Sequence, residues 1–133
     1  MKASVCAWAS ALVVAMCVVT AAHHSPAAFD RSKEVTLVGT VKDFRWQNPH
    51  TWLEVDVPDG KGATHTWGVE MTSPVFLIRA GWKNNSVKPG DKVTVLVNPV
   101  RDPETKAGIF ISITLADGRT LTERPARLGG AAK

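Results

Sequence analysis

Apolar and polar residues alternate in five short stretches of this 133-residue chain, and this pattern predicts five β-strands. In each stretch every second residue is apolar, so one face can pack against a core while the other meets solvent. Gly39, in the middle of the first stretch, predicts a bend or bulge there. In the last stretch, Ile109, Ile111 and Ile113 are expected to lie on one face. The predicted strands cover residues 35–46, 51–57, 64–71, 93–97 and 108–115.

One short helix is predicted between the third and fourth strands. Ser73 and Pro74 are typical of an N-cap and a first helical residue, and Gly81 is a natural terminator. Three strands, a helix and two strands follow one another in the order of the OB barrel. We therefore predict an all-β protein with one short helix, folded as a small five-stranded antiparallel, OB-like barrel. Another small antiparallel barrel or a sandwich is the alternative, because element order does not fix topology.

The N-terminal 22 residues have the pattern of an export signal. A positive head, Met1-Lys2, precedes an uncharged apolar run, and Thr20-Ala21-Ala22 places small residues before a cut. We predict that residues 1–22 are a signal peptide and that the protein is periplasmic or secreted. Three alternatives are an uncut membrane anchor, a cut after Ala21, and lipidation at Cys17, where Met16 departs from the lipoprotein pattern.

Removing residues 1–22 leaves 111 residues, enough for one domain. We assign residues 23–120 to the barrel with an N-terminal arm, and residues 121–133 to a flexible basic tail. Both cysteines leave with the signal, so a metal site would need nitrogen and oxygen ligands. The remaining 15 basic and 12 acidic side chains do not cluster. Because the charges do not cluster and export removes the usual nucleic-acid targets, we predict no nucleic-acid partner. Cleavage of the signal would leave no stable membrane span. The expected partner is an envelope protein or a small ligand.

Cleavage after Ala22 would expose a chelating group at the new N-terminus. The amine and the imidazole of His23 would lie on one residue, and His24 could bind through the amine, a backbone amide and its own imidazole. Copper(II) has the highest affinity among first-row divalent ions for such nitrogen sites. The other interpretation is a solvated end of the chain that serves only export and cleavage.

A second group of polar residues is expected on one face of the hairpin formed by the second and third strands. With the turn centred on Gly60, Glu70 lies opposite His50, Gly68 opposite Trp52, and Thr66 opposite Glu54; a shift of two residues keeps the face but changes the partners. His50 could supply a further nitrogen to the metal, with Glu70 or Glu54 as an outer ligand. Alternatively, this is an ordinary exposed face on which Trp52 covers a glycine.

Several short motifs lie along the chain after the signal. They are His23-His24-Ser25 with Phe29-Asp30, Asn48-Pro49-His50 with Trp52, Glu70-Met71 with Ser73-Pro74, Gly81-Trp82, Lys88-Pro89-Gly90-Asp91, and Leu115-Ala116-Asp117-Gly118-Arg119. Together they resemble a family of short exported bacterial proteins whose function is uncharacterised. The resemblance covers nearly all of the chain after the signal and implies an exported, single-domain β protein, without an activity or site residues.

These observations favour an exported binding protein that holds copper(II), or another transition metal, through its N-terminal histidine. The alternative is a module without metal, which would bind a small ligand, a glycan or an envelope protein through the Trp52 and Glu54 face or beside the helix. We do not predict an enzyme. The sequence has no G-x-S-x-G motif, no phosphate-binding loop and no cysteine after the signal.

Overall fold

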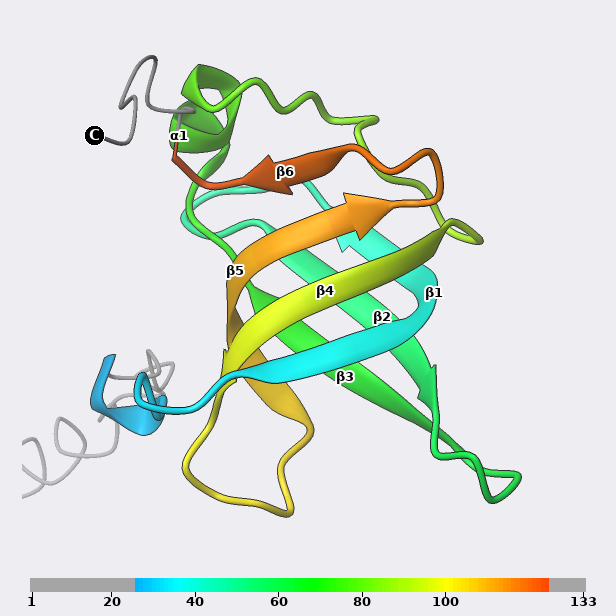
Figure 1. Ribbon diagram of the computed structural model, residues 1–133. Helices are drawn as coiled ribbons and strands as arrows, with labels where there is room; N and C mark the ends of the chain where they lie inside the picture. The colour runs from blue at the N-terminus through cyan, green and yellow to red at the C-terminus, as the bar shows by residue number, and fades with distance from the viewer. Residues whose placement is uncertain (1–25, 125–133) are drawn as a thin grey trace, which may run out of the picture.

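The computed structural model describes residues 26–124 and confirms the OB-like barrel (Figure 1). A 3-10 turn, η1, precedes the first strand, and the helix α1 lies between the third and fourth strands. The elements are η1 Pro26–Ala28, β1 Val35–Arg45, β2 Trp52–Pro58, β3 Thr64–Glu70, α1 Pro74–Arg79, β4 Lys92–Pro99, β5 Ala107–Leu115 and β6 Thr120–Thr122.

The first five strands close on themselves in the order β1-β2-β3-β5-β4 and back to β1. Four of these pairings are antiparallel, but β3 and β5 run parallel where they close the barrel. The prediction of an entirely antiparallel barrel is therefore corrected to a mixed one. The cause is the number of strands: along β3-β2-β1-β4-β5 each strand is antiparallel to the next, so the first and last of these five strands run in the same direction where they close the barrel.

The core fills the inside of the barrel, and the predicted alternation places most of it. Leu37 and Val41 of β1, and Leu53 and Val55 of β2, are at most 2 % exposed, while their neighbours in the sequence face outward. The same rule holds along β4. The rest of the core cluster comprises Val69, Met71, Leu77, Trp82, Val87, Val93, Val95, Val97, Phe110 and Ile113.

Gly39 lies where β1 passes from one neighbour to the other. It pairs with Val93 of β4, and a Cβ atom on it would overlap the carbonyl oxygen of Asp56 in β2. The ladder between β1 and β2 slips by one residue between Val41 and Asp43. The predicted irregularity is thus present as a close backbone approach at Gly39 followed by a bulge.

The prediction that three isoleucines lie on one face of β5 is wrong. Phe110 and Ile113 face the core, whereas Ile109 and Ile111 are half-buried on the other side. The ladder between β4 and β5 shifts between Leu96 and Val97, so the inward side changes from even to odd positions. A bulge reverses the alternation beyond it, and nothing in the local sequence marks its position.

The helix α1 and the short strand β6 cover one end of the barrel. Leu77 of α1 is fully buried, and the indole Nε1 of Trp82 donates a hydrogen bond to the carbonyl oxygen of Thr122 at 2.8 Å. Leu121 packs against the core, and β6 pairs with β5. The predicted tail therefore does not begin at residue 121: the folded part continues to Arg124, and residues 125–133 lie outside the described part.

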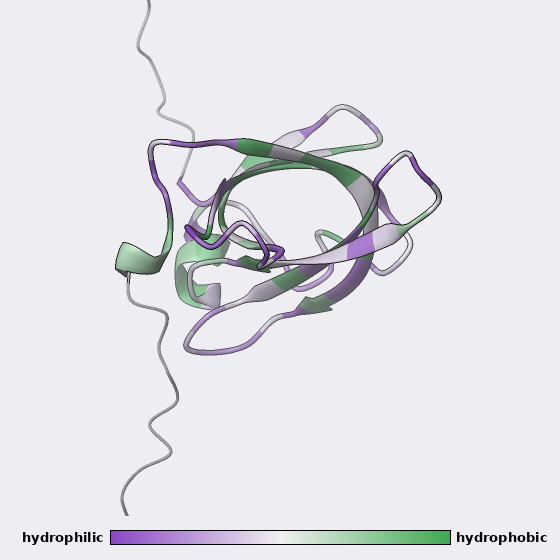
Figure 2. Ribbon diagram, turned by 90° about the horizontal axis from the view of Figure 1, so that it is seen from below, coloured by the Kyte–Doolittle hydropathy of each residue, from purple (hydrophilic) through white to green (hydrophobic). Residues whose placement is uncertain are grey.

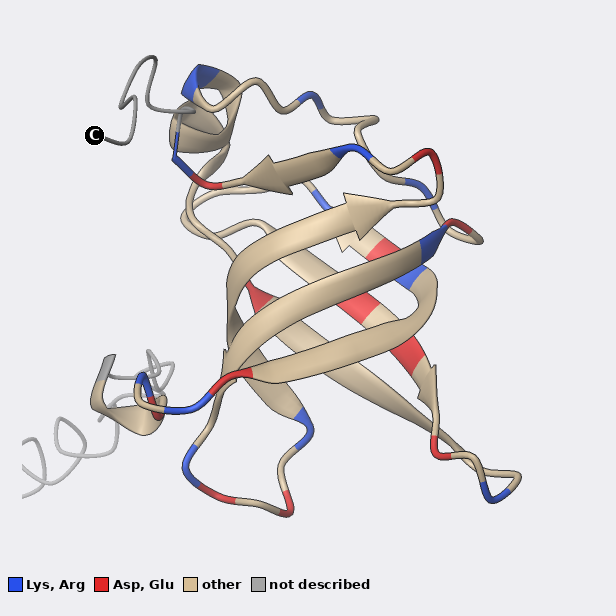
Figure 3. Ribbon diagram, in the orientation of Figure 1, with Lys and Arg blue, Asp and Glu red and all other residues tan. Residues whose placement is uncertain are grey.

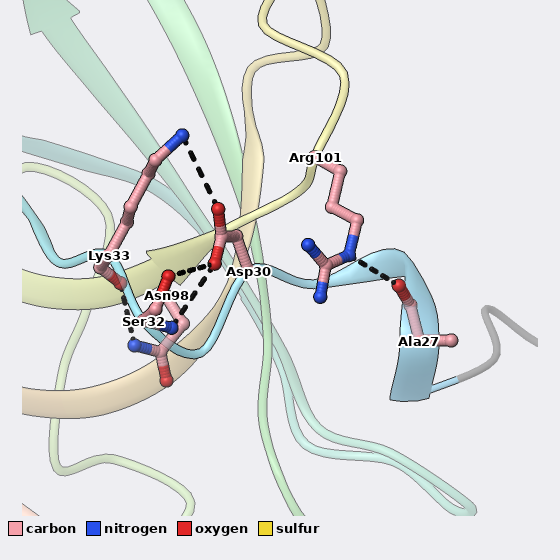
Figure 4. Close-up of polar contacts among 6 residues, drawn as sticks. All are labelled: Ala27, Asp30, Ser32, Lys33, Asn98 and Arg101. Atoms are coloured by element: carbon pink, nitrogen blue, oxygen red, sulfur yellow. Dashed lines mark hydrogen bonds and ion pairs between the residues drawn. The ribbon is translucent and has the colours of Figure 1, made fainter.

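The N-terminal arm is fixed along the end of β4 (Figure 4). Phe29 is buried and bridges to Val100, while the Arg101 guanidinium donates to the carbonyl oxygen of Ala27 at 3.0 Å. The Asp30 carboxylate accepts from the hydroxyl of Ser32 at 2.6 Å, and this bond lowers the pKa of Asp30. The arm is thus held in place from its first described residues.

In the described region, no helix is both long enough and apolar enough to cross a membrane. The predicted signal peptide lies outside that region.

Candidate functional site

His50, just before β2, and Glu70, at the end of β3, contact each other at the end of the barrel that α1 covers. The Nδ1 atom of His50 lies 2.8 Å from Oε1 of Glu70 and 3.1 Å from the carbonyl oxygen of Met71. The Glu70 side chain is only 16 % exposed, whereas that of His50 is 52 % exposed. The carboxylate therefore lies beneath an imidazole that faces solvent.

The two contacts of His50 fix the position of its proton. An ionised carboxylate and a carbonyl oxygen both accept hydrogen bonds, so Nδ1 must carry the hydrogen. In the neutral ring, Nε2 then keeps its lone pair. Among residues 26–124, no group bonds to this atom. His50 consequently offers solvent one unoccupied nitrogen in a defined orientation.

The hairpin register is shifted by two residues from the one centred on Gly60, which is the alternative that keeps the same face but changes the partners. Trp52, not His50, lies opposite Glu70, and Gly68 lies opposite Glu54. The turn is centred on Lys61, because the Asp59 carboxylate accepts hydrogen bonds from the backbone of the loop and widens it. His50 lies beyond the start of β2, so its ring reaches Glu70 from the end of the ladder.

Trp52 and Glu54 share the outer face of β2, as the alternation predicts. The end of the Trp52 ring lies over Gly68, where an added Cβ would be 2.7 Å from Cζ2. Glu54 instead binds Arg45 of β1 through a 3.1 Å ion pair. Figure 3 shows acidic positions on β1, β2 and β3. Because Glu54 is paired with a cation, it is a poor candidate for a metal ligand.

A third carboxylate, that of Glu123, completes the surroundings of the His50–Glu70 pair. It accepts a hydrogen bond from the backbone amide of Thr72 at 2.6 Å. Burial raises the pKa of Glu123, and the negative charge of Glu70 acts in the same direction, whereas the Thr72 hydrogen bond and His50 oppose the rise. Sequence analysis missed this residue, because it follows the last predicted strand and no periodicity marks it.

A groove of about 490 Å³ connects this end of the barrel with the N-terminal arm. Arg31 of the arm lies at its border, and Glu123 lines it beside the half-buried Ile109 and Ile111. Ile109 and Ile111, which do not share the face of Ile113, therefore line a surface groove. The full lining comprises Arg31, Asn98, Ile109, Phe110, Ile111, Thr122, Glu123 and Arg124.

The predicted metal ligands divide into two pairs. His50 and Glu70 are in contact, whereas His23 and His24 lie outside the described residues. Within residues 26–124, no three His, Cys, Asp or Glu side chains converge as the ligands of one ion. A metal site there would need a further donor from outside this region.

The described region is a five-stranded OB-type barrel with a histidine–glutamate pair at one end. The chain belongs to a family of unknown function (DUF6152), whose profile matches residues 10–110. This confirms the expected membership of an uncharacterised family. Among curated proteins, none matches the sequence.

Solved structures of a mitochondrial single-stranded DNA-binding protein from S. cerevisiae, Rim1, resemble this chain. Its second crystal form has a TM-score of 0.49 and 13 % identity, covering 63 % of this chain and 93 % of that one. The first form has a TM-score of 0.48 and 14 % identity, covering 63 % and 92 %.

The prediction that nucleic acid is excluded as a partner is corrected by this comparison, because the similar structures are named single-stranded DNA-binding proteins. At such low identity, the likeness concerns the fold, and it assigns no partner to this chain.

Proposed function

We propose that this protein is an exported barrel that binds copper(II) through its processed N-terminus and His50. The amine and imidazole of His23 form the primary chelate, with His24 as the alternative imidazole, and Nε2 of His50 adds a nitrogen. The parts played by His23 and His24 rest on the sequence, since both lie outside the described residues. A periplasmic or secreted location belongs to the same proposal.

The observation that carries the proposal is the orientation of His50. Histidines that bind metals almost always donate their other ring N–H to a carboxylate or a backbone carbonyl, which fixes the tautomer and raises the basicity of the ligating nitrogen. His50 has both kinds of acceptor at Nδ1, within 3.1 Å, and its side chain is 52 % exposed. Glu70 then orients the ligand from behind.

The chemistry of the donor set fits copper better than harder ions. Amine and imidazole nitrogens suit copper(II), which leads the affinity order at nitrogen sites. An N-terminal amine titrates near pH 8, so a metal displaces its proton easily at neutral pH. Magnesium and calcium prefer several oxygen ligands, and Glu54 and Glu123 are each already bonded to a protein group.

The test begins with the exported protein, purified without detergent, and the mass of its mature chain. Copper(II) is then titrated in, and the EPR spectrum is recorded for the wild type and four variants. We expect sub-micromolar binding that His23→Ala weakens strongly, because only the His24 chelate then remains, and that His50→Ala weakens about tenfold or more. Glu70→Gln should weaken it by about 10- to 100-fold, as outer-shell partners of ligands do.

His65→Ala is the matched control. Like His50, His65 is a half-exposed histidine beside a carboxylate, 3.6 Å from Asp59, but it lies on β3 at the far end of the hairpin. Its loss should leave the copper affinity unchanged. Absence of sub-micromolar binding, or equal affinity in His50→Ala, would refute the proposal. A mature chain that begins with Ala22 or with a lipidated Cys17 would remove the His23 chelate.

A further inference from the structure

The helix α1 exposes a concentrated apolar surface. Val75, Phe76 and Ile78 are 50 %, 52 % and 60 % exposed. The described region has four large apolar side chains with such exposure, and the fourth, Val38, lies on β1. Figure 2 shows α1 as a mainly apolar coil on the outside of the barrel. Leu77 is the buried residue of α1, whereas Val75, Phe76 and Ile78 each expose half of their surface or more to solvent.

A shallow groove beside α1 extends this surface. It has a volume of about 510 Å³, and the indoles of Trp46 and Trp82 form part of its wall. Trp46 is only partly buried against the core. Ile78 and Lys83 also line the groove, so its lining combines apolar side chains with one cationic side chain, that of Lys83.

The charged side chains of α1 and of the segment that follows it have one sign. Between Met71 and Gly90 the sequence has three basic residues and no acidic residue. The Arg79 guanidinium lies 5.8 Å from the centre of the Phe76 ring, so one of these cations borders the exposed apolar side chains directly. An anionic partner with an apolar interior complements this combination.

We infer that α1 and the adjoining groove dock the protein on the surface of an anionic phospholipid bilayer. Val75, Phe76 and Ile78 enter the boundary between headgroups and acyl chains, and Arg79 and Lys83 contact lipid phosphates. Trp46 lies beside them, and tryptophan is enriched at membrane interfaces. A stable protein interface needs about 800 Å² on each partner, much more than three half-exposed side chains provide. The inference does not depend on metal binding.

The test measures binding of the exported protein, purified without detergent, to sedimented vesicles. Vesicles with about one third phosphatidylglycerol should bind it, and pure phosphatidylcholine should bind it much less. Raising the salt concentration should release the protein. Phe76→Ser combined with Ile78→Ser should lower the partition coefficient at least about tenfold. Arg79→Ala and Lys83→Ala should each lower it about fivefold.

Val38→Ser is the matched control, because it removes an equally exposed apolar side chain from β1. It should bind like the wild type, and circular dichroism should show every variant folded. Equal binding by the Phe76/Ile78 variant, or no preference for the anionic vesicles, would overturn the inference. So would a concentration-dependent dimer, or a stable complex with another protein, that the same variant abolishes while vesicle binding stays unchanged. Copper titration of these variants should match the wild type, so each proposal can fail alone.

Discussion

At the scale of single residues, Glu123 links the end of the chain to the candidate site. Its carboxylate accepts a hydrogen bond from the Thr72 amide, and the charges of His50 and Glu70 act on it. Burial raises its pKa above the ordinary value of 4.5. The folded protein therefore holds this proton more tightly than the unfolded chain does.

Glu123 should make stability fall as the pH rises. Above pH 4.5 the unfolded chain releases this proton first, so the free energy of unfolding decreases until the folded carboxyl has also ionised. Glu123→Gln keeps an oxygen for the Thr72 amide but cannot ionise. Urea denaturation of both proteins between about pH 4 and about pH 7 should show the variant gaining stability relative to the wild type. A difference that does not change with pH would contradict the assigned shift.

His50 shows how far a residue's role can be predicted from the sequence. The expected contact with Glu70 is present. It was predictable because alternation alone places both residues on one side of the hairpin. The orientation of the ring was not predictable. The ring orientation depends on the carbonyl oxygen of Met71. The turn at residues 59–63 sets the register of the hairpin, and this register places Met71 opposite Thr51, beside His50.

At the scale of elements, two glycines show where strands and side chains approach most closely. A Cβ on Gly39 would overlap backbone of β2, whereas a Cβ on Gly68 would meet the end of the Trp52 ring. Backbone within a closed barrel cannot move independently, but a surface ring can rotate away. The two positions should therefore respond differently to the same substitution.

Gly39→Ala should lower the free energy of unfolding by about 2 to 3 kcal/mol, because β1 and β2 must separate to admit the methyl group. Gly68→Ala, the matched control, should cost less than about 1 kcal/mol, since the Trp52 ring can turn to another rotamer. Urea denaturation measures both values. Equal losses would show that the approach of β1 to β2 at Gly39 does not constrain the barrel.

At the scale of the whole molecule, β6 closes the end of the barrel that holds the candidate site. It adds Leu121 to the core and accepts the Trp82 indole hydrogen bond, and Glu123 follows directly after it. These contacts join the last described residues to α1 and to the β3–α1 connection. The end of the described chain thus belongs to the cooperative fold.

A chain that ends at Arg119 should be less stable by about 3 kcal/mol, because Leu121 leaves the core and the Trp82 N–H loses its acceptor. The melting temperature should fall by about 10 °C or more. A chain that ends at Arg124 keeps every contact described here and serves as the control. Thermal unfolding followed by tryptophan fluorescence measures both. An unchanged melting temperature in the shorter chain would exclude β6 from the cooperative unit.

The sequence alone determined the five barrel strands, the helix and the order that defines the barrel, because alternation, proline and glycine act over a few residues. It also placed His50, Trp52, Glu54 and Glu70 on one side. Only the tertiary structure decided the parallel closure of β3 against β5, the reversal of faces within β5, and the position of Glu123 beside Thr72. Each of these depends on residues far apart in sequence, whose meeting is set by how the barrel closes.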